Sequence, residues 1–191
     1  HQIVQTQRQE LLATVSQQAQ PDTIILVSPN HFSAGQAGIQ TTDRTWTLEN
    51  GTEQIFSNTP VIQQLVESGM VDNKNTSFNA EHGIKNVLAD IHVAFPNTTL
   101  MPLILKDSVG QENIEELSQQ LFAICSSCGL IASVDMSHDN PADVAEIHDI
   151  KTLRSLTTLD EEDIWNVEVD SQPSLALLLA WAKQQGTEKF V

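Results

Sequence analysis

Histidine and aspartate side chains follow the predicted strands of this chain. His31 stands in Ser-Pro-Asn-His directly after an apolar run, and His138 follows a later run, with Asp135 three residues before it. His82 begins a predicted helix, and His1 is the first residue of the sequence. Imidazole is the commonest ligand of transition metals and the commonest acid-base group near neutral pH. These positions predict that several imidazoles and one carboxylate converge at one sheet edge, although a single His after a strand is usually ordinary.

Other residues with reactive side chains are weaker candidates. Cys125 and Cys128 have C-x-x-C spacing but end a predicted helix, and no second pair is present to complete a zinc site. We interpret both as buried structural cysteines and His92 and His148 as ordinary helix residues. The sequence contains none of the motifs G-x-G-x-x-G, G-x-x-x-x-G-K-[ST], H-E-x-x-H and G-x-S-x-G, so we expect no nucleotide cofactor.

The charge of the chain limits its partners. Among 191 residues, 25 Asp and Glu stand against nine Lys and Arg, which gives a net charge of -16. So acidic a surface repels nucleic acids and anionic membranes, and we expect neither as a partner. No apolar run approaches the length of a membrane span, and the low cysteine content favours a cytoplasmic location.

The elements that must position these residues alternate between strands and helices. Residues 24–27 form a continuous apolar run, which is typical of a strand covered on both faces. Two similar runs follow at 100–105 and 130–134, and Pro102 suggests that the first lies at an edge or contains a bulge. Helical spacing occurs over 2–18, 59–69, 81–95, 111–126, from Pro141 onward, and over 175–182. The sequence thus predicts an α/β fold in which helices flank a central, mostly parallel sheet.

One long irregular stretch covers residues 28–58, directly after the first strand. Loops at this end of parallel strands commonly carry functional sites, although a short hairpin around Thr45-Trp46-Thr47 is an alternative. We treat 1–191 as a single domain and, since the sequence does not begin with Met, expect native residues before His1.

Several motifs in order resemble the Memo family, also called AmmeMemoRadiSam system protein B in prokaryotes. They are PDTIILVSPNHF, TTDRTW, AEHGI, PLIL and LIASVDMSHDNPADVAEIHD, and the similarity extends over about residues 1–185. The fold of that family is similar to that of the class III extradiol dioxygenases, which are non-haem iron enzymes with a three-layer architecture. The resemblance implies a metal-binding cleft for a small molecule or peptide, with iron or copper as cofactor and zinc as a further candidate.

The resemblance also implies roles for individual residues. His1 and His31 match metal-binding histidines of the family, and His82, Asp135 and His138 are expected to line the same cleft as proton-transfer groups. Several Memo proteins supply a Cys as third ligand after the last long helix, where this chain has none, and Glu188 is the nearest carboxylate there. A set of two His and one carboxylate suits iron.

Three hypotheses follow from the resemblance. The first is a metal-dependent oxidoreductase of the dioxygenase type with an unknown substrate. The second is a non-catalytic binding or adaptor module that uses the same cleft. The third is a family member with a structural role only, which the replacement of the second carboxylate in the family stretch E-H-S-x-E by Lys85 favours. The oligomeric state is not predicted.

Overall fold

A five-stranded sheet forms the centre of the protein. The computed structural model describes residues 2–48 and 51–188. The strands are β1 (Thr23–Pro29), β2 (Ile39–Thr41), β5 (Asp72–Asn73), β6 (Thr99–Leu105) and β7 (Gly129–Ala132), in the order β5-β2-β6-β1-β7. β1 is parallel to both β6 and β7, and β2 runs antiparallel to β6. The α/β fold with a mostly parallel sheet is therefore confirmed.

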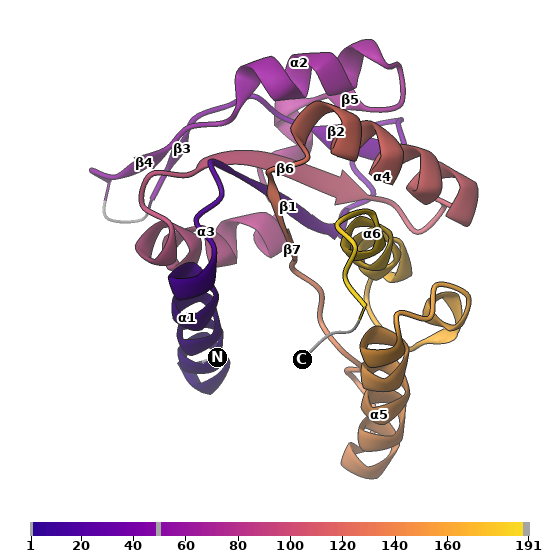
Figure 1. Ribbon diagram of the computed structural model, residues 1–191. Coiled ribbons are helices and arrows are strands. Elements are labelled where there is room, and N and C mark those ends of the chain that lie inside the picture. The colour runs from indigo at the N-terminus through magenta and orange to yellow at the C-terminus, as the bar shows by residue number, and fades with distance from the viewer. Residues whose placement is uncertain (1, 49–50, 189–191) are drawn as a thin grey trace.

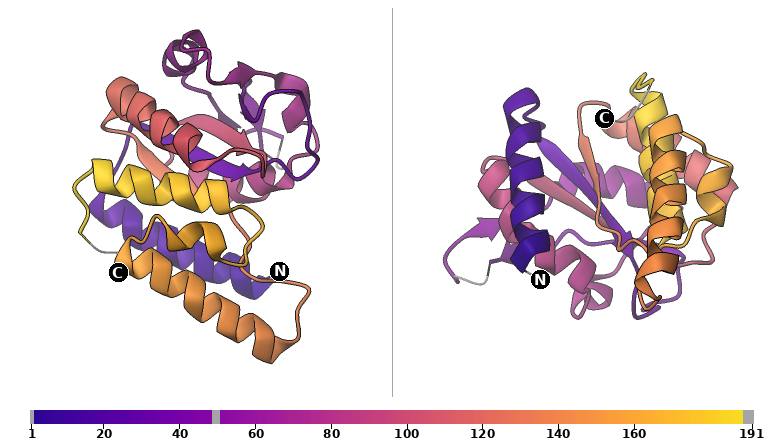
Figure 2. Two further views of the ribbon diagram at one scale, coloured as in Figure 1. Left: turned by 90° about the vertical axis from the view of Figure 1, so that its right-hand side faces the viewer. Right: turned by 90° about the horizontal axis from the view of Figure 1, so that it is seen from below.

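Helices cover both faces of this sheet (Figures 1 and 2). They are α1 (Gln2–Gln18), α2 (Thr59–Glu67), α3 (His82–Ala94), α4 (Gln111–Cys125), α5 (Ala142–Thr158) and α6 (Gln172–Gln184), with 3-10 turns η1 (Asn75–Phe78) and η2 (Asp163–Asn166). Ile25 and Val27 of β1 pack with α2, α4 and α6, whereas Ile24 and Leu26 pack with α1 and α3. Because side chains alternate along a strand, one continuous apolar run supplies both halves of the core.

Pro102 lies in a central strand, so the expectation of an edge or bulge was wrong. Leu100 and Lys106 direct their N–H groups toward the side of β2, and by alternation the nitrogen of Pro102 faces the same side. On that side β2 pairs only with residues 103–105, and the next contact is a bridge between Ser57 and Leu100. Pro102 thus occupies the gap between two neighbours, where no partner requires an N–H.

The stretch 28–58 contains more structure than a loop. It supplies β2 to the sheet and a separate hairpin of β3 (Trp46–Thr47) with β4 (Gln54–Ile55), which confirms the alternative of a short hairpin. β2 begins beside Leu105 at the carboxyl end of β6, and by Ser57 the chain has reached Leu100 near the other end of that strand.

Cys125 and Cys128 form a disulfide that joins the end of α4 to the turn before β7. The sequence interpretation of both as buried structural cysteines did not include this bond; Cys128 is buried, whereas Cys125 is partly exposed. Among the described residues, no helix has both the length and the apolar character that crossing a bilayer requires.

Candidate metal centre

A short, tightly held turn presents His31 at the carboxyl end of β1. The backbone N–H of Asn30 donates to the carbonyl of Leu105 (2.8 Å), which continues the pairing of β1 with β6 beyond the strand end. The Asn30 side chain then both donates to and accepts from the backbone of Ala34. Ser33 takes a positive φ of 46° inside this turn. The loop therefore reverses immediately after His31 and leaves its ring projecting from the sheet edge.

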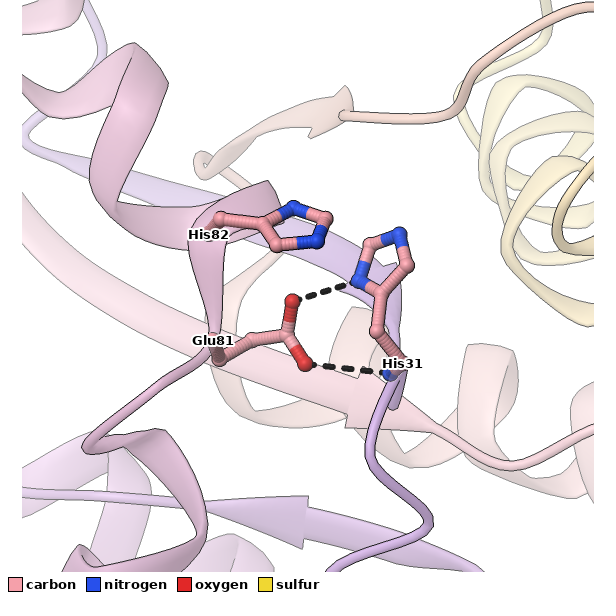
Figure 3. Close-up of side chains that lie close together, drawn as sticks. All are labelled: His31, Glu81 and His82. Atoms are coloured by element: carbon pink, nitrogen blue, oxygen red, sulfur yellow. Dashed lines mark hydrogen bonds and ion pairs between the residues drawn. The ribbon is translucent and has the colours of Figure 1, made fainter.

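Glu81 holds the His31 ring from below (Figure 3). It is the N-cap residue of α3, fully buried, and its Oε1 accepts from the backbone N–H of Gly83 at 3.1 Å. The same carboxylate accepts from the backbone N–H of His31 (3.1 Å) and contacts the ring Nδ1 at 2.6 Å. A carboxylate in this position selects the imidazole tautomer that carries its proton on Nδ1. The lone pair of the neutral ring is then on Nε2.

Asp170 faces that lone pair. Its Oδ2 lies 3.3 Å from Nε2 of His31, and its side chain is 12% exposed. Burial, together with the negative charge of Asp135, raises the pKa of Asp170 above its usual value. With Nε2 unprotonated and Asp170 ionised, two electron-pair donors face each other at hydrogen-bond distance. Such a pair is stable only when a proton or a cation lies between the two atoms.

A metal ion fits this spacing. Metal–nitrogen and metal–oxygen bonds of about 2.1 Å, at the roughly 90 to 109° angles of octahedral or tetrahedral sites, separate two ligand atoms by about 3.0 to 3.4 Å. The observed 3.3 Å falls within this range. The structure therefore has the donor atoms and the spacing that a metal-binding pair requires.

Asp170 is held in place by the segment that follows β7. The backbone N–H of Asp135 donates to Oδ1 of Asp170 (3.1 Å), and the N–H of Asp170 donates back to the carbonyl of Asp135. Ser171, the next residue, is the N-cap of α6 and accepts from the N–H of Ser174. Asp170 is thus fixed at a helix start, with Oδ2 left for His31.

His82 is the third member of the group. Its ring centroid lies 4.1 Å from that of His31 and 5.9 Å from that of the exposed Phe32. Possible ligand atoms of His31, Glu81 and His82 all lie within 4.8 Å of one another. Because Glu81 is fully buried and already accepts three contacts, we assign it to orienting His31. His31 and Asp170 then remain as candidate metal ligands, with His82 beside them.

The close approach of α3 to His31 depends on Gly83. A Cβ atom at this position would lie 2.0 Å from Oγ of Ser28 and 3.1 Å from Cε1 of His31. With glycine at this position, the first turn of α3 comes close enough for Glu81 to contact the His31 ring, and neither Ser28 nor His31 is displaced.

Asp135 and His138 lie on the loop between β7 and α5. Ser137 anchors this loop, since its hydroxyl donates to Asp149 (2.8 Å) and also lies 3.1 Å from the carbonyl of Ala145. His138 is exposed, and its Nδ1 lies 3.1 Å from the carbonyl of Met136. This hydrogen bond, with the charges of Asp139, Asp170 and Asp135, raises the pKa of His138 above its usual value. The backbone carbonyl of Met136 therefore orients this ring.

The predicted metal ligands have different outcomes. His31 is at the centre of the group, whereas His1 lies outside the described residues. Glu188 is exposed in the segment after α6, and neither Glu188 nor Asp170 belongs to the group of His31, Glu81 and His82 found among the described residues. Asp170 was not among the predicted ligands, and it is the last residue of the acidic run 160–170. Its position directly before a Ser-Gln-Pro helix start was the one sequence signal that could have separated it from that run.

Comparisons with known proteins agree with this architecture. A family model described as Memo-like protein matches residues 6–190. A MEMO1 family protein of Caldivirga maquilingensis is 21% identical over 184 residues, which cover 91% of this chain and 64% of that protein. One from Methanothermobacter thermautotrophicus is 26% identical over 157 residues, covering 77% of this chain and 54% of the relative. The chain thus spans about half to two thirds of the length of these curated relatives.

A solved structure supports the fold. An uncharacterized protein from Escherichia coli K12 superposes with a TM-score of 0.64 at 17% identity, covering 91% of this chain and 81% of the other. Since the family model covers nearly the whole sequence, the chain belongs to the Memo family.

Proposed function

We propose that this chain binds a transition-metal ion, iron or copper, through Nε2 of His31 and the carboxylate of Asp170, and uses it in redox chemistry on a small molecule. The observation that carries this proposal is the 3.3 Å separation of the two donor atoms. Glu81 supports it from the other side of the ring, because carboxylates commonly hold the second nitrogen of metal-binding histidines.

Asp170 replaces Glu188 as the proposed carboxylate ligand. It has the position and the burial that the exposed Glu188 lacks. A second imidazole completes a set of two His and one carboxylate, which suits non-haem iron. The resemblance assigns that role to His1, and His82 lies beside His31 as the proton-transfer group.

The other residues serve orientation and proton transfer. Glu81 keeps the proton of His31 on Nδ1, and the backbone of Asp135 directs Asp170 toward Nε2. The pKa of His138 is raised above the ordinary value, so this exposed imidazole is suited to donate a proton to a substrate. When bound, the metal would supply Lewis acidity and electron transfer, which these side chains lack.

Metal analysis of matched variants tests the proposal. Protein purified without a polyhistidine tag is loaded anaerobically with Fe(II) or Cu(I), desalted and analysed for metal content. We expect about one metal ion per chain in the wild type and in Glu188→Gln, and loss of metal in His31→Ala and Asp170→Asn. A wild type that retains no metal, or a Glu188→Gln variant that loses it while Asp170→Asn keeps it, contradicts the proposed ligand set.

Oxygen uptake then distinguishes an enzyme from a binding module. The metal-loaded protein is mixed with a catechol-type substrate, in keeping with the family resemblance, and dissolved O2 is recorded. Uptake that requires both metal and His31 supports the redox function. Metal binding with no uptake leaves the site as a binding site and refutes the oxygenase reading for this substrate class.

A further inference from the structure

Helix α5 has its polar and apolar sides reversed. The two buried residues of this helix are Thr152 and Ser155, and the hydroxyl of Ser155 donates to Asp163 at 2.8 Å. By contrast, Ile147 is 68% exposed and Ile150 is 61% exposed. Helices at a protein surface normally turn their apolar side inward. An outward apolar side on a helix that protrudes from the body therefore indicates an interaction surface (Figures 1 and 2).

The exposed side has the spacing of a helix-pairing seam. Asp143, Ile147, Ile150 and Arg154 follow one another at intervals of four, three and four residues, which places them on one stripe. A groove of about 660 Å³ lies along this stripe, and Ile147, Ile150 and Arg154 contribute to its wall. The stripe is thus apolar at its centre, acidic at one end and basic at the other.

This pattern is complementary to itself in the reverse direction. Ile147 and Ile150 lie equally far from a point between His148 and Asp149, and the same is true of Asp143 and Arg154. When two copies of the stripe run antiparallel about a two-fold axis, Ile147 of each meets Ile150 of the other. Asp143 of each then meets Arg154 of the other, and a two-fold interface requires this self-complementarity.

We propose that α5 pairs antiparallel with α5 of a second copy of this chain to form a two-fold symmetric dimer. Asp143 and Arg154 are both exposed. Among the described residues, the Arg and Lys side chains that form ion pairs are Arg8, Lys151 and Lys183, and Arg154 is not one of them. Arg154 therefore has its charge available for a second chain. This inference concerns a surface separate from the proposed metal site and does not depend on it.

The dimer is expected to be weak and dependent on concentration. A single helix pair buries less than the roughly 1,600 Å² of a standard interface. Net charges of -16 on each copy repel, as do Asp160 and Glu162 on the other wall of the groove. At about 0.15 M salt these longer-range repulsions are largely screened, while ion pairs in direct contact persist.

Sedimentation velocity of the 191-residue chain between about 1 µM and 1 mM tests the proposal. We expect a monomer–dimer equilibrium in the wild type. Asp143→Arg and Arg154→Asp should each raise the dissociation constant at least about tenfold, because both symmetry-related pairs become repulsive. The double variant exchanges the two charges and should restore wild-type association. Circular dichroism checks that α5 stays helical in every variant.

Two further variants test the apolar centre. Ile147→Ser should abolish dimerisation, whereas Leu11→Ser, which changes a similarly exposed residue of α1, should leave it unchanged. A wild type that stays monomeric at every concentration overturns the proposal and points to a different covering segment or partner. Dimerisation that persists unchanged in both single charge-reversal variants also overturns the proposal, because the interface then lies elsewhere. The same holds if the double variant does not restore association.

Discussion

Replacing Asp170 by Asn should stabilise the metal-free protein and weaken metal binding at the same time. An Asn can keep its oxygen as the acceptor for the N–H of Asp135 and place its NH2 group 3.3 Å from Nε2 of His31. The facing electron pairs are then replaced by a hydrogen bond, which contributes about 1 kcal/mol to the free energy of unfolding. For a chain of this size that gain corresponds to a rise of roughly 2–4 °C in Tm.

The advantage of the Asn variant should depend on pH in a defined direction. Because the pKa of Asp170 is raised in the folded state, the native protein binds the proton more readily than the unfolded chain. Ionised Asp170 therefore reduces stability above its folded pKa, and this penalty disappears as the pH falls toward the ordinary value of 3.8. The stability difference between Asp170→Asn and the wild type should be largest near pH 8 and should shrink on acidification.

Urea unfolding in the presence of a chelator, at pH 8 and at lower pH, measures this difference. Asp135→Asn is a useful comparison, because it removes a neighbouring charge but leaves the buried carboxylate of Asp170, and its effect should be smaller. With excess Co(II) the order should reverse, since the wild type alone gains stability from bound metal. A metal-free Asp170→Asn protein that is less stable than the wild type at pH 8 would refute the argument that two acceptors face each other.

Two further predictions concern the supports of the site and the packing of α1. Gly83→Ala should cost about 1–3 kcal/mol in urea unfolding through the clash with Ser28 and His31, and much of this cost should vanish in a Ser28→Gly background; an unchanged stability of Gly83→Ala alone would disprove the close approach. Arg8→Ala should cost about 1–3 kcal/mol, because Asp90 is 2% exposed and would keep only the hydrogen bond from Gln9; a loss below about 0.5 kcal/mol would show that water replaces the guanidinium.

The central strands and most helices were predictable from the sequence, because their apolar spacing is set by burial. The run at 24–27 is covered on both faces, and β6 and β7 were recognised in the same way. β2 and β5 were missed, since strands of three and two residues carry no measurable periodicity. Pro102 was assigned to an edge or a bulge, because its tolerance in a central strand depends on a gap between neighbours that only the register shows.

Half of the candidate site could be predicted, and the rest depends on topology. His31 and His82 follow signals that a sequence carries locally: a strand end and a helix start. Asp170 lies in an acidic segment far along the chain, and it reaches His31 because α6 packs beside β1. No local pattern distinguishes one carboxylate of such a run from its neighbours, and Glu188 was chosen in its place for its proximity in sequence to the expected third ligand.

A crystal structure of the protein loaded with Co(II), with anomalous scattering recorded at the cobalt edge, tests the central claim most directly. We predict one strong anomalous peak within about 2.1 Å of both Nε2 of His31 and a carboxylate oxygen of Asp170, with Glu81 still hydrogen-bonded to Nδ1. A peak coordinated by Glu188 or Glu81 without Asp170, or no peak near His31 under saturating metal, would contradict the account.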